Sequence, residues 1–452
     1  MMVLKPSKLT LALAFLSALI VANVSGPQYI YPTFGSSLND RFEWTPVENS
    51  IVSTSCFIGV SFSGPLCAWM LESLGITKTL RISAVLVFLG PFLVAQTYAG
   101  RLPSHFILCT VYLIFTGLGG AAAFLCALDS QSHNFKERRG LSMGLTTASV
   151  GICGVVFSQI NDLLFGPNVF SVNAPYSNDS TYHFLMFLSI CMATGILLGS
   201  FFLGPIVPAY EPILPDRVDQ EDTIKSETTL SGTDLLKHPI GGGIFCALFI
   251  VIGIGYVYLA NIGQILHAIS SESDQHDRNL HITLFSLGNC GSRVIFGALS
   301  DLLKNKYGVH RVWVFVYAIV TLLLALMFLV SHETISLEEL KPCTVIISMS
   351  YGILFGVAPA VTTEFGTKVF ARNWGLLLYA PAFGSQLFNV LFGVLYGTEA
   401  EKQHDHVCHG VVCYQSTFYV AICCNLVALG VLLLAIYKTS LYYTHPIEQK
   451  IH

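Results

Sequence analysis

The chain has 452 residues and a formal net charge of −4 at pH 7. Only 11% of its residues are charged, whereas 53% are hydrophobic, and the mean hydropathy is +0.64. Soluble domains carry roughly a quarter charged residues, so this composition excludes a soluble globular protein. It predicts an all-α polytopic membrane protein, because a surface so poor in polar groups must face lipid.

Twelve apolar runs are long enough to cross a bilayer, for which a helix needs roughly 20 residues. The first is longer than a signal peptide and is followed by eleven more, so we count it as a span. The predicted spans cover residues 9–33, 50–71, 79–98, 106–128, 140–165, 183–205, 240–267, 280–300, 311–331, 342–364, 375–397 and 416–437.

Basic residues lie mostly in the loops that share a side with both termini, which predicts that both termini are cytosolic. Residues 208–238 form the longest connection, with three prolines followed by acidic residues, and we predict a flexible cytosolic linker there. It divides the chain into six-span halves of residues 1–207 and 239–452. These halves have matching acids at their inner ends, which suggests two pseudo-symmetric bundles.

Arg293 lies within span eight, where a charge needs a partner or a watery cavity. Its planar guanidinium suits the carboxylate of a solute, or it is a structural arginine bonded to carbonyls or to Asn289. Other polar residues within spans line a solute cavity or only hold helices together. These further candidates are Asn261 and Gln264 in span seven, Asn23 and Gln28 near a Gly-Pro kink in span one, and Gln386 and Asn389 in span eleven.

Four acids mark the cytosolic ends of spans: Glu72, Asp129, Asp301 and Glu364, with Arg372 and other arginines close by in the sequence. Ion pairs between the bundles would bias a cytosolic gate towards its closed state. Exposed pairs stabilise little individually. The alternative is that these charges only fix the topology.

Cys408 and Cys413 lie in a non-cytosolic loop, where oxidising surroundings and a short turn favour a disulfide. The histidines His404, His406 and His409 leave a metal site as the alternative. Asn178-Asp179-Ser180 is a glycosylation sequon on the same side, and other histidines there, among them His281, would gain charge in an acidic compartment.

The chain resembles the major facilitator superfamily over its full length. The resemblance is carried by the loop from Gly64 to Lys78 and by its second copy from Arg293 to Asp301. Within the superfamily it is most similar to nodulin-like proteins and fungal monocarboxylate-transporter homologues. Three stretches carry that similarity: Gly253 to Gln264, Glu364 to Gly375, and Cys408 to Tyr414.

The resemblance implies two six-helix bundles, alternating access, cavity lining by Asn261 and Gln264, and gating by Asp301, Asp129 and Glu364. It also favours the vacuolar membrane, with the plasma membrane as the alternative. Two positions depart from the family pattern. Leu113 replaces a usual span-four arginine, and Asn289 replaces an acid one turn before Arg293, which weakens a lactate-type proton symport.

We therefore expect a monomeric secondary transporter in a lipid bilayer that moves a small organic solute, of which a monocarboxylate-like anion is the first choice. Amino acids, sugars and metal chelates are alternative solutes, and a transporter-like sensor without flux is the alternative function. No nucleotide-binding loop or catalytic cluster is evident, so we expect no enzyme, cofactor, resident metal or nucleic-acid partner. A proton is the default coupling ion, although no acid lies within the middle of a span.

Overall fold

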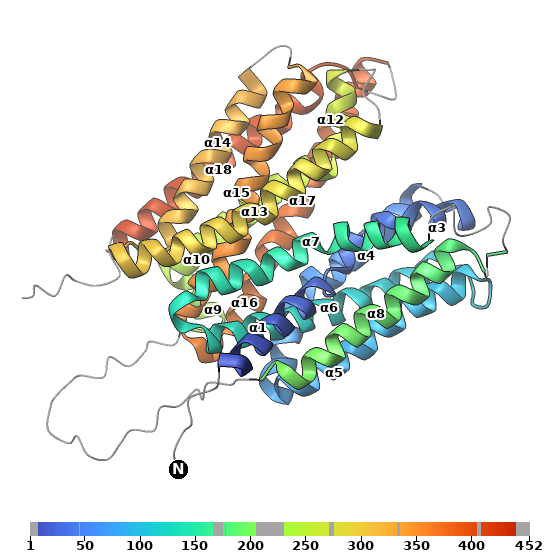
Figure 1. The fold of residues 1–452 in the computed structure, drawn as a ribbon. Coiled ribbons are helices and arrows are strands. Elements are labelled where there is room, and N and C mark those ends of the chain that lie inside the picture. The colour runs from blue at the N-terminus through green and yellow to red at the C-terminus, as the bar shows by residue number, and fades with distance from the viewer. Residues whose placement is uncertain are drawn as a thin grey trace, which may run out of the picture. The chain divides into compact units, whose positions relative to one another are not determined.

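The structure, a computed structural model, describes residues 8–44, 46–165, 175–176, 178–204, 230–270, 275–331, 335–404 and 408–439. Every element in these ranges is helical (Figure 1), which confirms the predicted all-α class. Ten of the helices are long and apolar enough to cross a membrane, and Leu9–Asn23 and Ile51–Phe62 are shorter apolar helices. All twelve predicted runs lie on helices, but several runs are interrupted.

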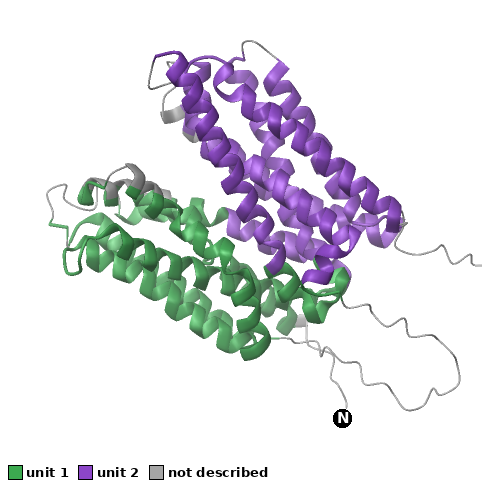
Figure 2. Cartoon of the chain, turned by 180° about the vertical axis from the view of Figure 1, so that it is seen from behind, with its two compact units in different colours: residues 1–136, 152–232, 362–375 green, residues 137–151, 233–361, 376–452 purple. Residues whose placement is uncertain are grey.

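The chain divides into two compact units (Figure 2). Unit 1 comprises residues 1–136, 152–232 and 362–375, and unit 2 comprises residues 137–151, 233–361 and 376–452. A division at the predicted linker would place residues 137–151 in the first half and 362–375 in the second, so each unit includes one short segment from the other half. Of the predicted linker, residues 208–229 lie outside the described residues, and its last part is helical.

In unit 1, α5 packs against α6 and α8, and α4 and α1 pack against α6. The first predicted span is three short helices followed by α3, because Gly26 and Pro27 interrupt it. The helices from the first half are α1 (Lys8–Asn23), α2 (Pro27–Ile30), η1 (Tyr31–Thr33), α3 (Gly35–Phe42), α4 (Pro46–Phe62), α5 (Gly64–Tyr98), α6 (Phe106–Asn134), η2 (Lys136–Arg138), α7 (Arg139–Phe165) and α8 (Ser180–Phe202).

The helix α5 contains the end of the second predicted span and all of the third. Gly75 separates the two parts with φ 79° and ψ 166°, a conformation that L-residues with a side chain rarely adopt. No atom lies within 4 Å of the place where a Cβ would stand. The backbone conformation, rather than crowding, therefore requires glycine at this turn between two spans.

In unit 2, α14 and α18 lie side by side (Figure 1), α10 packs on α18, and α11 packs on α17. The seventh predicted span is not one helix, because a π-turn precedes α11 and Asn261 separates α11 from α12. The helices from the second half are α9 (Thr233–Lys237), α10 (Pro239–Ala247), η3 (Leu248–Ile252), α11 (Gly253–Ala260), α12 (Ile262–Ile269), α13 (Gln275–Tyr307), α14 (Val312–Ser331), α15 (Leu337–Thr362), η4 (Thr363–Phe365), η5 (Thr367–Val369), α16 (Phe370–Leu377), α17 (Tyr379–Lys402) and α18 (Val412–Thr439).

Candidate solute site and end clusters

Arg293 lies on α13 with only 3% of its surface exposed. Its Nε donates to Asn289 Oδ1 at 2.9 Å, and its Nη1 donates to the Thr147 carbonyl at 2.7 Å. The guanidinium carbon lies 5.0 Å from the ring centroid of Phe355, a cation–π contact. Nη2 is buried and has no hydrogen-bond partner among the described residues. Arg293 thus makes the predicted structural bonds and still has one donor group available.

Small residues on two neighbouring helices allow this close arrangement. A Cβ at Gly356 of α15 would stand 2.7 Å from Arg293 Cα, and one at Gly352 would stand 2.3 Å from the Asn289 carbonyl oxygen. On the other side, a Cβ at Gly144 of α7 would stand 2.5 Å from the Arg293 carbonyl oxygen. The glycines therefore bring α15 and α7 onto the backbone of α13, as small residues do in membrane interiors.

The predicted solute residues Asn261 and Asn389 are joined. Asn261 Nδ2 donates to Asn389 Oδ1 and to the Val257 carbonyl, both at 2.9 Å. Asn261 stands at the break between α11 and α12, with φ −108° and ψ 15°. Asn261 Oδ1 and Asn389 Nδ2 make no hydrogen bond within the described residues, which leaves one acceptor and one donor from two helices. The orientations of both amides are assigned from this hydrogen bonding.

Among the described residues, neither Gln264 nor Gln386 is hydrogen-bonded to Asn261 or Asn389. Gln264 is exposed on α12, Gln386 is half-buried on α17, and Asn23 ends α1 half-buried. Gln28 lies on α2 in unit 1, where its Oε1 is buried without a hydrogen-bond partner among the residues that the structure describes. At the same interruption of span one, Cys153 Sγ lies 3.4 Å from the Gly26 carbonyl and donates to it.

At the predicted cytosolic end of unit 1, the residues Glu72 and Arg372 form an ion pair of 2.6 Å. The two helices approach closely beside it, since a Cβ at Gly64 would stand 2.2 Å from the Gly375 carbonyl oxygen. Arg372 is 55% exposed at its side chain, so water screens the pair. The sequence predicted both members, and the structure places residues 362–375 in the same unit as Glu72.

Asp129 and Glu364 are the other two predicted gate residues of unit 1. Asp129 Oδ2 lies 3.6 Å from His133 Nδ1, one turn later on α6. Glu364 lies half-buried in η4, and its contacts do not include a hydrogen bond or ion pair to Arg372. Glu72 therefore makes the ion pair with Arg372, whereas Asp129 pairs locally.

At the corresponding end of unit 2, Asp301 accepts three hydrogen bonds. The donors are the backbone nitrogens of Gly140 at 2.9 Å and Leu141 at 2.8 Å, and Arg311 Nη2 at 2.5 Å. Asp301 is 7% exposed and Arg311 2%. A carboxylate at the first turn of α7 is stabilised by the free N–H groups there. The sequence predicted Asp301 but not Arg311, whose position at the start of span nine indicated only topology.

A second missed residue is Asn373, which is fully buried in unit 1. Its Oδ1 accepts from the Gly232 nitrogen at 3.1 Å, and its Nδ2 donates to the Leu230 carbonyl at 2.8 Å. One carboxamide therefore holds the backbone on both sides of Ser231, just before α9. No spacing in the sequence connects position 373 with position 231, so only the folded chain reveals the contact.

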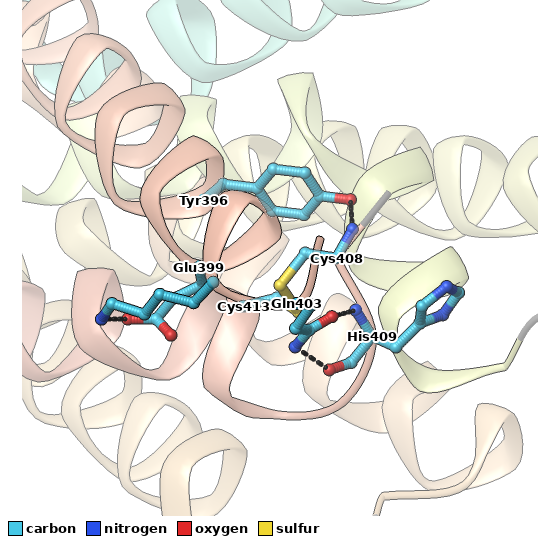
Figure 3. Close-up of a disulfide and its surroundings, with 7 residues drawn as sticks. Tyr396, Glu399, Gln403, Cys408, His409 and Cys413 are labelled. Atoms are coloured by element: carbon cyan, nitrogen blue, oxygen red, sulfur yellow. Dashed lines mark hydrogen bonds and ion pairs between the residues drawn. A yellow bond between two sulfur atoms is a disulfide. The ribbon is translucent and has the colours of Figure 1, made fainter. Parts of the chain in front are cut away.

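Cys408 and Cys413 are bonded in a loop that packs onto the ends of two helices (Figure 3). Gln403, the C-cap of α17, donates to the His409 carbonyl at 2.8 Å and accepts from its nitrogen at 2.7 Å, and the Tyr396 hydroxyl accepts from the Cys408 nitrogen at 3.2 Å. The Gly410 nitrogen donates to the Ala268 carbonyl at the end of α12. His406, considered as a metal ligand, lies outside the described residues. The sequon residue Asn178 is exposed and precedes α8.

Residues 10–365 match the sequence profile of the Major Facilitator Superfamily. The chain belongs to this superfamily. It is therefore a multi-pass membrane transporter and not an enzyme, as the sequence predicted.

Alignments with curated relatives cover nearly the whole chain. An uncharacterized membrane protein of Saccharomyces cerevisiae, YMR155W, is 23% identical and the alignment covers 91% of this chain and 92% of that protein. The probable transporter mch1 of Neurospora crassa is 21% identical, with 94% and 88% covered. The chain is thus similar over most of its length to a fungal probable transporter, as the sequence predicted.

Solved structures support the same fold. The proton:xylose symporter XylE aligns with a TM-score of 0.68 at 14% identity, covering 95% of each chain. The transporter FucP in its outward conformation aligns with a TM-score of 0.61 at 12% identity, covering 94% of this chain and 98% of that one. At these identities the likeness concerns the fold alone.

Proposed function

We propose that this chain is a secondary transporter that carries a small monocarboxylate-like anion across a membrane by alternating access. The observation that carries the proposal is the buried Nη2 group of Arg293, which has no partner among the described residues. A buried cationic donor attracts an anion strongly where water is scarce. The two other bonds of the guanidinium, to Asn289 and Thr147, hold it in one orientation for that contact.

The residues Asn261 and Asn389 provide the second part of the proposed solute site. Their joined amides leave one acceptor and one donor, which suit the polar end of a small solute. Both lie in unit 2, as Arg293 does. Because Asn261 stands where α11 ends and α12 begins, a solute bound there would influence the movement of the outer part of span seven.

The end clusters provide the proposed gate. Glu72 with Arg372, and Asp301 with Arg311 and the start of α7, are polar contacts that bias one state of the transporter and are released in another. The solvent-screened Glu72 pair contributes less than the buried Asp301 cluster. We also propose a monomer in the vacuolar membrane with cytosolic termini, based on the loop charges and the similarity to the fungal branch.

The test uses purified full-length protein in liposomes and radiolabelled acetate, pyruvate and L-lactate in counterflow. We expect at least one of these anions to exchange in the wild type. Arg293→Ala and Arg293→Lys should both reduce exchange at least tenfold, because an ammonium cannot reproduce the planar fork. Lys306→Ala, an exposed cation on the same helix α13, is the control and should exchange as the wild type does.

Two outcomes would contradict the proposal. Exchange that survives in both Arg293 variants, with normal amounts of folded protein, would reject the solute contact. The absence of exchange with all three anions would reject the solute class. A neutral polar solute is the second candidate, favoured by the free donor and acceptor of Asn261 and Asn389, and xylose and glycine in the same assay would test it.

A further inference from the structure

His281, at the start of span eight, differs from the other histidines on the predicted non-cytosolic side. The sequence groups His281 with histidines of the non-cytosolic surface, but its residue is only 1% exposed. It is the second residue of the apolar segment Leu280–Tyr307. An ionisable side chain buried in a membrane-spanning segment is rare and commonly functional. Its partners therefore indicate what it does.

His281 belongs to a buried chain of hydrogen bonds across three helices. Its Nδ1 lies 2.7 Å from Thr344 Oγ1 on α15, and the Tyr258 hydroxyl on α11 lies 2.6 Å from the same oxygen. Thr344 and Tyr258 are fully buried. Thr344 Oγ1 also lies 3.0 Å from the Leu340 carbonyl. Three groups thus converge on one hydroxyl that has a single proton.

This arrangement holds the imidazole in both its neutral and its charged state. In both states Nδ1 keeps its proton and donates to Thr344, whose own proton turns to the Leu340 carbonyl, and the Tyr258 hydroxyl donates to Thr344. The ring therefore keeps its position while its charge changes. Nε2 makes no hydrogen bond within the described residues and is the atom available to an added proton.

The charges around the ring come from the elements packed against it. Asp277 and Arg278 lie on the first turn of α13, Glu338 and Lys341 lie on the first turns of α15, and His267 lies on α12. Burial and Lys341 oppose a protonated ring, whereas the two acids favour it. Glu338 and Lys341 form an ion pair with each other. The balance of these charges depends on pH and on what else is bound.

The chain of hydrogen bonds includes α13, which carries Arg293, and α11, whose C-cap is Asn261. Tyr258 precedes Asn261 by three residues, less than one helical turn. Asn289 follows His281 by eight residues and Arg293 follows by twelve, roughly 12 and 18 Å along α13 at 1.5 Å per residue. His281 therefore lies on the same helix as Arg293, the proposed contact to the anion.

We propose that His281 is the proton-binding residue that couples proton movement to transport of the anion. The proposal rests on the proposed function. The proton enters at Nε2 from the non-cytosolic phase, so that anion and proton together add no net charge to the membrane interior. Thr344 and Tyr258 are positioning residues that hold the ring in both protonation states. His281 would then be the group that couples proton and anion movement, a role for which the sequence offers no acid in the middle of a span.

The test compares two measurements on full-length protein in liposomes with radiolabelled pyruvate. The first is counterflow at equal pH, and the second is accumulation driven by an imposed pH difference. In His281→Gln, which keeps an amide able to bond to Thr344, the ratio of driven accumulation to counterflow should fall at least tenfold. His267→Gln, an exposed histidine of the same unit, should keep the wild-type ratio.

The variant Thr344→Val supplies a second measurement in case His281→Gln does not fold. It removes the hydroxyl without changing the volume greatly, and it should shift the pH of half-maximal driven accumulation by at least half a unit. An unchanged ratio in His281→Gln would overturn the proposal. If that variant fails to fold, an unchanged pH dependence in Thr344→Val would overturn it.

The failure of this inference is distinguishable from failure of the proposed function. If the wild type exchanges none of acetate, pyruvate and L-lactate, the proposed solute class fails, and the proton site is judged by stability instead. The difference in unfolding temperature between wild type and His281→Gln should then change between pH 5 and pH 8, because a titrating group links protonation to stability. A constant difference across that range would overturn the proton site.

Discussion

Oδ1 of Asp301, near the end of α13, lies 2.9 Å from the backbone nitrogen of Gly140, at the first turn of α7. The two residues are 161 positions apart in the chain. The contact places residues 137–151 in the same compact unit as α13. The same carboxylate also accepts from the Leu141 nitrogen and from Arg311 Nη2, so its removal would leave three donors without this acceptor.

Replacing Asp301 by asparagine should lower stability, because the buried Arg311 would lose the carboxylate that it contacts. Removing one partner of a buried pair typically costs about 3–5 kcal/mol. The unfolding temperature in detergent measures the loss. Asp234→Asn, at an exposed acid paired with Lys237, should change it little. Combining Asp301→Asn with Arg311→Met should restore part of the loss, and no restoration would argue against this explanation.

Gly297→Ala should destabilise unit 2. A Cβ there would stand 2.4 Å from the Gly140 carbonyl oxygen, so the helices must separate, at about 1–3 kcal/mol. Gly291→Ala, on the same helix α13, has no atom within 4 Å of its new Cβ. It should be neutral or stabilise by about 0.5–1 kcal/mol. Equal unfolding temperatures for the two variants would refute the close contact.

Asn373→Leu should expose the backbone around Ser231 to proteases. The substitution removes both hydrogen bonds that hold residues 230 and 232, and loss of about 1.4 kcal/mol of local stability raises the open fraction tenfold. Limited proteolysis followed by mass spectrometry measures the cleavage rate there. Asn305→Leu, at an exposed residue of α13 that donates to the Glu137 carbonyl, is the control. Cleavage at the wild-type rate would contradict the predicted role of Asn373.

The double variant Cys408→Ser/Cys413→Ser should unfold at lower temperature, because the loop would lose the constraint that holds it to α17 and α12. A closed loop of this length contributes about 2 kcal/mol in the chain-entropy account. A reducing agent should lower the unfolding temperature of the wild type and of Cys423→Ser, a free exposed cysteine on α18. It should leave the double variant unchanged. If reduction affects all three equally, the effect comes from elsewhere.

Asn178 should carry a glycan when the chain is made in a eukaryotic secretory route. Its side chain is exposed, and the predicted topology places it outside the cytosol. Glycosidase treatment should increase gel mobility of the wild type and not that of Asn178→Gln. Ser180→Ala should behave like Asn178→Gln, because it removes the sequon and keeps the asparagine. Identical mobility of treated and untreated wild type would contradict both occupancy and the supporting evidence for topology.

The sequence predicted those residues of the candidate site whose polar side chains are energetically unfavourable inside a membrane. Arg293, Asn261 and Asn389 were evident because polar groups within apolar runs are expensive in lipid. The pairing of Asn261 with Asn389 was not evident, since they are 128 positions apart and no short-range pattern connects them. Asn373 and Arg311 were missed for the same reason, because each acts through a distant part of the chain.

By itself, the sequence determined the class, the positions of the twelve apolar runs and the family, because the bilayer imposes length and composition on each span separately. Tertiary structure decided where the runs break, as at Gly75 and Asn261, and which residues are buried together. His281 shows the difference most clearly. Its place beside a loop indicated a surface position, but packing against Thr344 and Tyr258 removed it from water, because burial depends on neighbours that only the fold brings close.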